Sequence, residues 1–363
     1  MQSNGVELIS SVSLHERRKT DHIRIALAED VGFGRRTTGL EEFRFEHQAL
    51  PELDLAEVDT ATTFLGRRLS APILISCMTG GAERGAQINR RLAIGAQHAR
   101  VALGLGSGRA ALDDPRLAET FLVRDLAPDI PLLANIGASQ LIEADGLTRC
   151  QRLVSMLEAD ALVIHANPLQ EALQPEGTPH FRGVLEAVET LTHELTVPVI
   201  VKEVGWGVSG SVARLLVCAG VTGVDVAGAG GTSWSEVERH RVADPTMRDV
   251  ARSFQEWGIP TAESVVACRN AFSGGLVVAS GGLRSGIDVA KCIALGADAA
   301  GLAAPFLQAA VRGVVEVVET IRRIRTELQI CMFCIGAQDI SALRRTPHLI
   351  REGSRHEPST NRA

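Results

Sequence analysis

The sequence predicts an α/β protein built as a (β/α)8 TIM barrel, and three features of the chain indicate it. Eight short apolar runs recur along the 363 residues, windows of helical periodicity separate most of them, and a polar or glycine-rich segment follows each run. Runs that are apolar throughout are typical of parallel strands covered on both faces. A doubly wound open sheet has the same period, but its first strand should lead into GxGxxG, and this chain has Met78-Thr79-Gly80-Gly81 there.

The eight predicted strands start 22 to 54 residues apart, which is a βα spacing. The longest interval follows the sixth strand and holds an inserted, charge-rich segment at about 228–260, which we expect to form a loop or short helices over the mouth of the barrel. After the eighth strand we expect one long helix over 306–324 and another over 331–343. In order, the strands are predicted to begin at Pro72, Val101, Pro131, Ala161, Pro198, Thr222, Leu276 and Asp298.

Three parts of the chain follow from this assignment. We predict an N-terminal extension at 1–70, the barrel at 71–343, and a polar C-terminal tail at 344–363 that is expected to fray. No apolar run approaches the roughly 18 to 20 residues of a membrane span, and the N-terminus lacks the basic start of a signal peptide. We therefore expect a cytoplasmic protein that does not act at a membrane.

Composition narrows the function further. The net charge of −6 argues against a nucleic-acid partner, because binding to a phosphate backbone needs an excess of cations. The seven cysteines are scattered and do not form a disulfide framework, and the Cys331-x-x-Cys334 pair lacks the further ligands that zinc requires. The chain has no tyrosine, which excludes every enzyme class that uses a phenol as acid or oxyanion donor.

The segments that follow strands six, seven and eight indicate a phosphate site. Active sites of such barrels lie at the C-terminal ends of the strands. Glycines at 228–232 and 280–284, and the junction at 303–305, supply backbone N–H groups that can approach a phosphate closely. The alternative is that these glycines only turn the chain. Hydroxyls of Thr232 and Ser280 among them favour phosphate binding.

Lys202 ends the apolar run of the fifth predicted strand, so its amine is expected to point into the barrel mouth. It could form a Schiff base or hold a negative charge on a bound group, and the absence of a second lysine nearby disfavours the Schiff base. A structural ion pair with Glu203 or Glu171 is the alternative.

A cluster of polar residues follows the fourth strand. His165, Asn167, Gln170 and Glu171 stand where one divalent ion could bind, although a lone histidine is more often a core residue. Magnesium accepts a single carboxylate when the substrate supplies phosphate oxygens. Glu171 would therefore suffice if the substrate is a diphosphate or a similar anion.

Cations near the N-terminus could clamp a second phosphorylated molecule. Arg18, Lys19 and His22 lie in a charged run that would otherwise be solvated surface, and Arg109 follows the second strand. A guanidinium binds phosphate in a bidentate manner.

These residues together resemble one family, the type 2 isopentenyl-diphosphate isomerases, which are FMN-dependent enzymes of isoprenoid synthesis. The resemblance runs from about Arg18 to about Asp339. Its motifs are RKTDHI at 18–23, HQALPE at 47–52, MTGG at 78–81, GSGRA at 106–110, HANPLQE at 165–171, VIVKEVGWG at 199–207, DVAGAGGTSW at 225–234, WGIPT at 257–261 and SGGLRSGIDVAKCIALGAD at 280–298.

The resemblance implies FMN at the strand ends. Thr79, Ser107 and Asn135 would touch the flavin ring or its ribityl chain, with Lys202 near N1 and the C2 carbonyl. The phosphate would be held by Thr232, Gly281, Gly282, Ala303 and Ala304.

The resemblance also implies a substrate and a reaction. Isopentenyl diphosphate would become dimethylallyl diphosphate by a 1,3-allylic proton shift, with FMN reduced by NADPH and acting as acid and base, and with Gln170, Lys202 and His165 as the catalytic residues. Glu171 would carry Mg²⁺, and the enzyme would be a homo-oligomer, a tetramer or octamer. The substrate would be bound by Arg18, Lys19, His22, Arg109, His165, Asn167 and Gln170.

Two other functions are weighed against this one. An FMN-linked oxidase or dehydrogenase would need an active-site tyrosine with a His–Arg pair, or a catalytic cysteine, and neither is evident. A non-catalytic phosphate-binding barrel would be indicated by loss of Lys202, Gln170 or Glu171, and all three are present. Gly108 departs from the family pattern, which has a longer side chain there, so the shape of the diphosphate pocket is in question.

Overall fold

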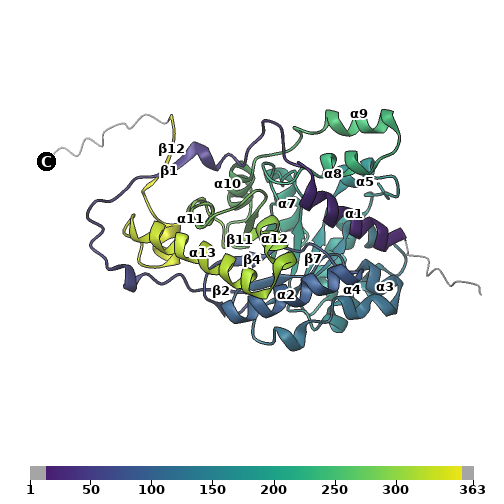
Figure 1. Cartoon of the computed structure of the whole chain (residues 1–363), viewed down its shortest axis with the longest axis horizontal. Coiled ribbons are helices and arrows are strands. Elements are labelled where there is room, and N and C mark those ends of the chain that lie inside the picture. Colours follow the sequence, from purple (N-terminus) through teal and green to yellow (C-terminus); the bar gives the residue numbers. More distant parts are fainter. Residues whose placement is uncertain (1–13, 354–363) are drawn as a thin grey trace, which may run out of the picture.

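The structure is a computed structural model, and it describes residues 14–353. Eight parallel strands form a closed barrel in which the eighth strand pairs with the first (Figure 1). Each predicted strand overlaps one observed strand, so the predicted fold is confirmed. The barrel strands are β4 (Ile73–Ile75), β5 (Ala102–Gly104), β6 (Leu132–Gly137), β7 (Ala161–His165), β8 (Val199–Lys202), β9 (Gly223–Asp225), β10 (Leu276–Ser280) and β11 (Ala299–Leu302).

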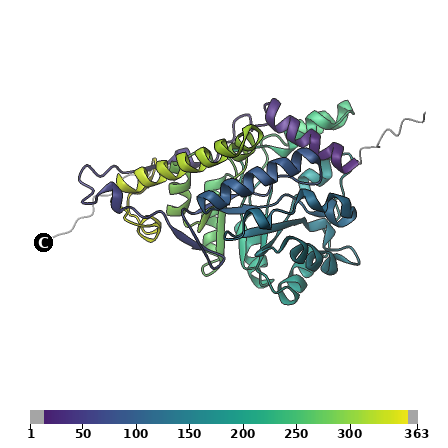
Figure 2. The same ribbon diagram turned by 60° about the horizontal axis from the view of Figure 1, so that its bottom comes forward.

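Helices surround the barrel, and in Figure 2 the longest, α13 (Val314–Phe333), lies along α2 (Glu83–Ala99). Short 3-10 helices lie at Leu40–Glu42, Leu55–Glu57, Pro115–Thr120, Arg124–Leu126 and Ala138–Gln140. The other helices that follow the barrel strands are α3 (Arg109–Asp113), α4 (Gly146–Leu157), α5 (Pro168–Leu173), α6 (Val184–Glu194), α7 (Gly210–Cys218), α10 (Thr261–Ala271), α11 (Gly286–Ala294) and α12 (Ala304–Arg312).

Two predicted helices differ from the structure. The helix expected over 306–324 is divided, because extended backbone at Gly313 (φ 166°) separates α12 from α13. The helix expected over 331–343 does not form as one element, since α13 continues to Phe333 and α14 (Ile340–Arg344) begins after a turn.

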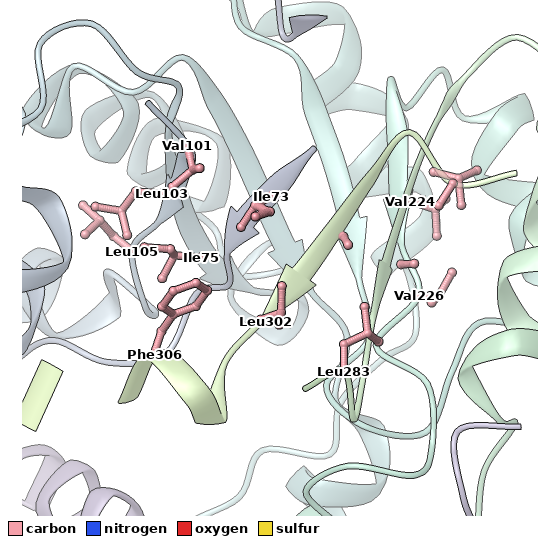
Figure 3. Packing of buried hydrophobic residues seen from close by; sticks show 14 of the residues in the cluster. Ile73, Ile75, Val101, Leu103, Leu105, Val224, Val226, Leu283, Leu302 and Phe306 are labelled. Carbon is pink, nitrogen blue, oxygen red and sulfur yellow. The ribbon is translucent and has the colours of Figure 1, made fainter. Parts of the chain in front are cut away.

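Side chains alternate along the barrel strands between two apolar clusters. Ile73 and Ile75 belong to the cluster between barrel and helices, whereas Leu74 belongs to the cluster inside the barrel. Figure 3 shows Ile75 and Leu105 close to Phe306 of α12. Because this alternation has a period of two, it also fixes which terminal residue of each strand points into the barrel.

The N-terminal extension covers both ends of the barrel. Its helix α1 (Leu14–Ala28) contacts α8 (Trp234–Arg241) and α2. Its hairpin of β2 (Thr62–Phe64) and β3 (Arg67–Leu69) places Phe64 and Leu69 in the cluster inside the barrel. This hairpin closes the end of the barrel where the strands begin.

The C-terminal residues and the insertion are also ordered into elements. The tail was expected to fray, but β12 (Leu349–Arg351) pairs antiparallel with β1 (Phe43–Phe45) of the N-terminal extension. The tail beyond residue 353 and the first 13 residues lie outside the described part of the chain. The insertion forms α8 and α9 (Pro245–Ser253), as predicted. Between residues 14 and 353 we find no helix with the length and apolarity needed to cross a bilayer.

Candidate active site

A cavity of about 240 Å³ lies at the C-terminal ends of the barrel strands. Every residue that the sequence nominated for catalysis, cofactor, substrate or metal lines it. They are Arg18, Lys19, His22, Thr79, Ser107, Arg109, Asn135, His165, Asn167, Gln170, Glu171, Lys202, Thr232, Gly281, Gly282, Ala303 and Ala304.

The alternation of side chains explains why residues of separate strands meet in this cavity. Val163, Ile200 and Val278 face the barrel interior. Two positions further along the same strands stand His165, Lys202 and Ser280, so each of them ends its strand facing inward. Each of these polar side chains is therefore placed at the mouth by strand register.

His165 is held in one tautomer. Asn135 donates its amide to the carbonyl of Val163 at 3.2 Å, so the Asn135 oxygen accepts from Nδ1–H of His165 at 3.0 Å. Burial, followed by the charges of Lys19, Lys202 and Arg18, lowers the pKa of His165 to about 3. His165 is therefore neutral at pH 7, and its Nε2 is left as an acceptor.

The carboxylate partner of Lys202 is neither of the two that the alternative interpretation named. Its Nζ donates to the backbone carbonyl of Glu203 at 2.7 Å and lies 3.6 Å from Oδ2 of Asp225 on β9. The alternative of a structural ion pair with Glu203 or Glu171 is therefore wrong, since the carboxylate that faces Lys202 is Asp225. One carboxylate oxygen of Glu203 accepts hydrogen bonds from the backbone N–H groups of residues 204, 205 and 206. Burial raises the pKa of Glu203 to about 7, although these three hydrogen bonds act to lower it.

The residues after β7 connect to the insertion. Asn167 donates to Oε1 of Gln170 at 2.9 Å and to Oε1 of Glu171 at 3.0 Å. Gln170 in turn donates to Oε1 of Glu238 on α8 at 3.0 Å. The carboxamide of Gln170 is thus fixed on both sides. A second carboxylate oxygen of Glu171 accepts the N–H of Thr178 at 2.6 Å.

Sequence reasoning missed Glu238 because the insertion reads as a charged surface segment. The side chain of Glu238 has 0% exposure, and it also contacts His22 at 3.0 Å and Arg241 at 2.6 Å. Burial alone would raise the pKa of Glu238, but the hydrogen bonds and charges of His22 and Arg241 outweigh it and lower the pKa. Its position three residues before Arg241 is the only signal that could have marked it. Other cavity residues that were not nominated are Ser76, Cys77, Met78, Gln140, Gln174, Trp234, Arg284 and Gln308.

Helix α1 brings the side chains of Arg18, Lys19 and His22 over the cavity. Burial, and then the neighbouring Arg18, lower the pKa of Lys19 to about 8. Burial also lowers the pKa of His22, although its hydrogen bond to Glu238 acts in the opposite direction. The ring of His22 stands edge-on to Trp234 of α8, with ring centres 5.0 Å apart. Helix α1 is therefore held to the insertion at the cavity wall.

Arg109 begins helix α3 at the opposite wall, where Asp113 lies 3.4 Å from its Nε. The preceding residue, Gly108, donates its N–H to the carbonyl of Asn135 at 2.7 Å. A Cβ at position 108 would lie 2.4 Å from Cδ1 of Leu153 on α4, which is fully buried. The sequence left the effect of Gly108 on the diphosphate pocket open, and in the structure this position faces α4 and does not line the cavity.

Close backbone packing accounts for glycine in the loops after β9 and β10. A Cβ on Gly281 (φ 103°) would lie 2.1 Å from the carbonyl oxygen of Gly228, and one on Gly282 (φ 79°) would lie 2.6 Å from that of Gly230. Both positive φ values also favour glycine. Together with the start of α12 at Ala304, these two loops form a cradle of backbone at one end of the cavity.

Several buried polar atoms of the cavity wall have no hydrogen-bond partner in the described residues. They include Oγ of Ser76, Oγ1 of Thr79 and Oδ1 of Asn167. Buried polar groups are nearly always paired, so unpaired ones that line a cavity indicate a ligand site. Residues 14–353 hold no group of three or more His, Cys, Asp or Glu side chains that could bind a metal on their own.

Known proteins match this chain over most of its length. A family model described as FMN-dependent dehydrogenase matches residues 145–351. An isopentenyl-diphosphate delta-isomerase from a Nostoc species is 50% identical over 336 residues, which cover 93% of this chain and 96% of the relative. Proteins of the same name from a Synechococcus species and from Oceanobacillus iheyensis are 51% and 44% identical, covering 94% and 91% of this chain and 98% and 95% of their own lengths.

Solved structures confirm the fold alone. A mandelate oxidase with (S)-2-phenylpropionate has a TM-score of 0.62 at 22% identity, covering 92% of this chain and 96% of that one. A mandelate oxidase mutant with an FMN adduct has a TM-score of 0.63 at 21% identity, covering 93% and 98%. The family match and the near full-length identity of about one half show that the chain is an enzyme of the isopentenyl-diphosphate delta-isomerase family, built on the barrel of the FMN-dependent dehydrogenases.

Proposed function

We propose that this enzyme converts isopentenyl diphosphate to dimethylallyl diphosphate by a 1,3-allylic proton shift and that it uses FMN and Mg²⁺. The observation that carries the proposal is that one cavity gathers a backbone cradle, a buried lysine, a fixed carboxamide, and the side chains of Arg18, Lys19, His22 and Arg109. Relatives about 50% identical over nearly the whole chain bear the name of this activity.

The residues at one end of the cavity fit FMN. The cradle formed by Gly281, Gly282 and the start of α12 suits a phosphate, since helix N-termini and close-packed backbone N–H groups favour anions. Oγ1 of Thr79 is buried without a partner among the described residues and would meet the ring or the ribityl chain. Ser107, Asn135 and Thr232 complete the proposed FMN contacts, with Ala303 and Ala304 at the phosphate.

The other end of the cavity suits a diphosphate. Arg18, Lys19 and His22 come from α1, and Arg109 stands opposite them. Glu171 is the carboxylate that would hold Mg²⁺, and the unpaired Oδ1 of Asn167 is an oxygen donor within the same cluster. A single protein carboxylate suits Mg²⁺ when substrate oxygens and water complete its shell. We propose that Arg18, Lys19, Arg109 and the Mg²⁺ held by Glu171 share the charge of the diphosphate, with His22 as a further contact.

Bound FMN, in its reduced form, would supply the acid–base group at N5 and the electron density that stabilises a developing tertiary carbocation. Lys202 would hold negative charge at the N1 edge of the ring. Gln170, fixed by Asn167 and Glu238, would lie against the reacting carbons and exclude water from them. His165 is neutral before substrate binds, and the negative charge of a diphosphate raises the pKa of a neighbouring imidazole, so His165 would become a donor to it.

A second function, oxidation of a hydroxy acid on the same barrel, is less well supported. The solved mandelate oxidases share the fold at about one fifth identity. The present chain has no tyrosine that could stand beside the flavin.

We further propose NADPH as the reductant, a cytoplasmic location, an assembly of four or eight copies, and no nucleic-acid partner. These four proposals rest on the resemblance and the composition.

One anaerobic assay tests the proposed function. Purified protein is combined with FMN, Mg²⁺ and isopentenyl diphosphate, the flavin is reduced with dithionite or NADPH, and the products are analysed. We expect dimethylallyl diphosphate only when the flavin is reduced and Mg²⁺ is present. Absence of this product with reduced flavin bound would refute the proposal.

A further inference from the structure

Three consecutive barrel strands end in side chains that form a connected polar chain beneath the cavity. Lys202 ends β8, Asp225 ends β9 and Ser280 ends β10. Lys202 and Asp225 are direct partners in the register of the parallel sheet. Oδ2 of Asp225 lies 3.6 Å from Nζ of Lys202, and Oδ1 of Asp225 accepts the hydroxyl of Ser280 at 2.5 Å.

Asp225 is deeply buried, and both of its carboxylate oxygens are engaged. Its exposure is 2%, and that of Lys202 is 8%. A buried carboxylate stays ionised when an opposite charge and a hydrogen-bond donor face it. The ammonium of Lys202 and the hydroxyl of Ser280 supply these two partners. Asp225 does not line the cavity itself, so it reaches a ligand only through its neighbours.

Neighbouring ionisable groups leave Asp225 as the counter-charge of Lys202. The carboxylate of Glu203 is directed to three backbone N–H groups of the following loop. Burial raises the pKa of the Cys77 thiol to about 12, while Lys202 lowers this pKa and Asp225 raises it by smaller amounts. This cavity residue is therefore neutral at pH 7. The pair of Lys202 and Asp225 therefore carries no net charge.

We infer that Asp225 is a positioning residue and counter-charge for Lys202, and that it sets how strongly the site stabilises reduced over oxidised FMN. This inference rests on the proposed binding of FMN beside Lys202. In the wild-type protein the negative charge of Asp225 offsets part of the field that Lys202 exerts on an anionic reduced flavin. Without that carboxylate the lysine charge is uncompensated, and the reduced cofactor is bound more tightly relative to the oxidised one.

The test measures dissociation constants of oxidised and reduced FMN, and the midpoint potential of the bound flavin, in wild type and Asp225→Asn. We expect the ratio of oxidised to reduced dissociation constants to rise about tenfold in Asp225→Asn, with a positive shift of the potential. Asp298→Asn, a change of a partly buried aspartate at the opposite end of the barrel, is the matched control and should leave the ratio unchanged. Asp225→Ser, which also removes the charge and keeps a polar partner for Ser280, replaces Asp225→Asn if that protein does not fold.

A double variant separates action through Lys202 from direct action on the flavin. In Lys202→Met the charged side chain through which Asp225 is inferred to act is absent. Adding Asp225→Asn to Lys202→Met should therefore change the ratio less than twofold. An unchanged ratio in the folded single variant, or an equal shift in the Lys202→Met background, would overturn the inference. Failure of the wild-type protein to bind FMN would instead contradict the proposed function.

Discussion

The two ends of the barrel use charged residues in opposite ways. At the end where the strands begin, Asp160 precedes β7 and accepts the N–H of Leu132 at 2.8 Å together with Arg67 and Arg124 at 2.7 Å each. Asp298 precedes β11 and repeats the arrangement with other partners, the N–H of Val277, Arg269 and Arg344. At the end where the strands finish, buried polar atoms of the cavity wall lack partners among the described residues.

This difference separates groups that hold the fold from groups that bind ligand. A carboxylate that accepts a neighbouring strand's N–H and two guanidinium groups is fully satisfied, so it fastens adjacent strands together. Oγ1 of Thr79 and Oδ1 of Asn167 have no partner among the described residues, as we expect of atoms that would bind a ligand. Substitutions at the beginning of the strands should therefore reduce stability, and those at the mouth should reduce binding and turnover.

The largest expected effect is at the mouth. Glu171→Gln removes the carboxylate that is proposed to hold Mg²⁺, so kcat/KM should fall by roughly 1000-fold, as loss of several kcal/mol of charge stabilisation implies. The dependence of the remaining activity on Mg²⁺ should also disappear. Turnover at several Mg²⁺ concentrations measures both, with Glu319→Gln on the exposed face of α13 as the matched control. A Glu171→Gln protein with wild-type turnover would contradict the assignment.

At the beginning of the strands, Asp160→Asn should lower the free energy of unfolding by about 3 kcal/mol, because two guanidinium groups lose a partly buried partner. Denaturant unfolding measures the loss. The affinity of the folded protein for FMN should not change. The exposed pair of Glu319 and Arg322 provides the contrast, since Glu319→Gln should cost less than about 0.5 kcal/mol. A large loss of FMN affinity in Asp160→Asn would erase the distinction between the two ends.

The pH dependence of substrate capture should report Lys19. Because its pKa is lowered to about 8, Lys19 loses its charge as the pH rises through 8. Above that pH, kcat/KM should fall by about tenfold per pH unit. The substrate binds the charged form more tightly, so it should limit this fall by favouring protonated Lys19. Lys19→Arg should move this decline to higher pH. The unfolded chain binds more protons than the folded one between about 8 and 10.5, so Lys19 makes stability rise over this range, and unfolding cannot explain the decline. Equal pH profiles for both proteins would contradict the assignment.

The smallest effect on substrate binding and turnover is expected for a substitution behind the mouth of the barrel. Gly108→Gln should cost about 1 to 3 kcal/mol, because the new side chain meets buried Leu153. Combining it with Leu153→Ala should cost at least about 1 kcal/mol less than the sum of the two single changes. The KM for isopentenyl diphosphate should stay within twofold, and a larger change would show that position 108 does face the substrate.

Sequence reasoning succeeded where one periodicity decides the structure. All eight strands were predicted because strands covered on both faces are continuous apolar runs, and the mouth residues followed from their positions at the strand ends. The break at Gly313 was missed because the apolar pattern continues through it. The strand at Leu349–Arg351 was missed because three residues carry no periodicity, and its pairing with Phe43–Phe45 joins distant parts of the chain.

Partners within the site were harder to predict than its members. Asp225 was not assigned to Lys202 because their contact depends on the register between β8 and β9. Glu238 was not recognised because its burial arises only when α8 packs against α1 and α5. Local sequence thus nominates polar residues at strand ends, whereas long-range packing decides which of them become paired.

Thermal unfolding measured against FMN concentration tests most directly the claim that the mouth binds ligand while the opposite end holds the fold. At 100 times the dissociation constant, wild type and Asp160→Asn should both gain about 2.7 kcal/mol of stability, although the variant begins lower. Lys202→Ala leaves the buried carboxylate of Asp225 without its cation and should also begin lower, but it should need a higher FMN concentration for the same gain. A melting temperature that does not respond to FMN, or an equal response in Lys202→Ala and wild type, would contradict the account.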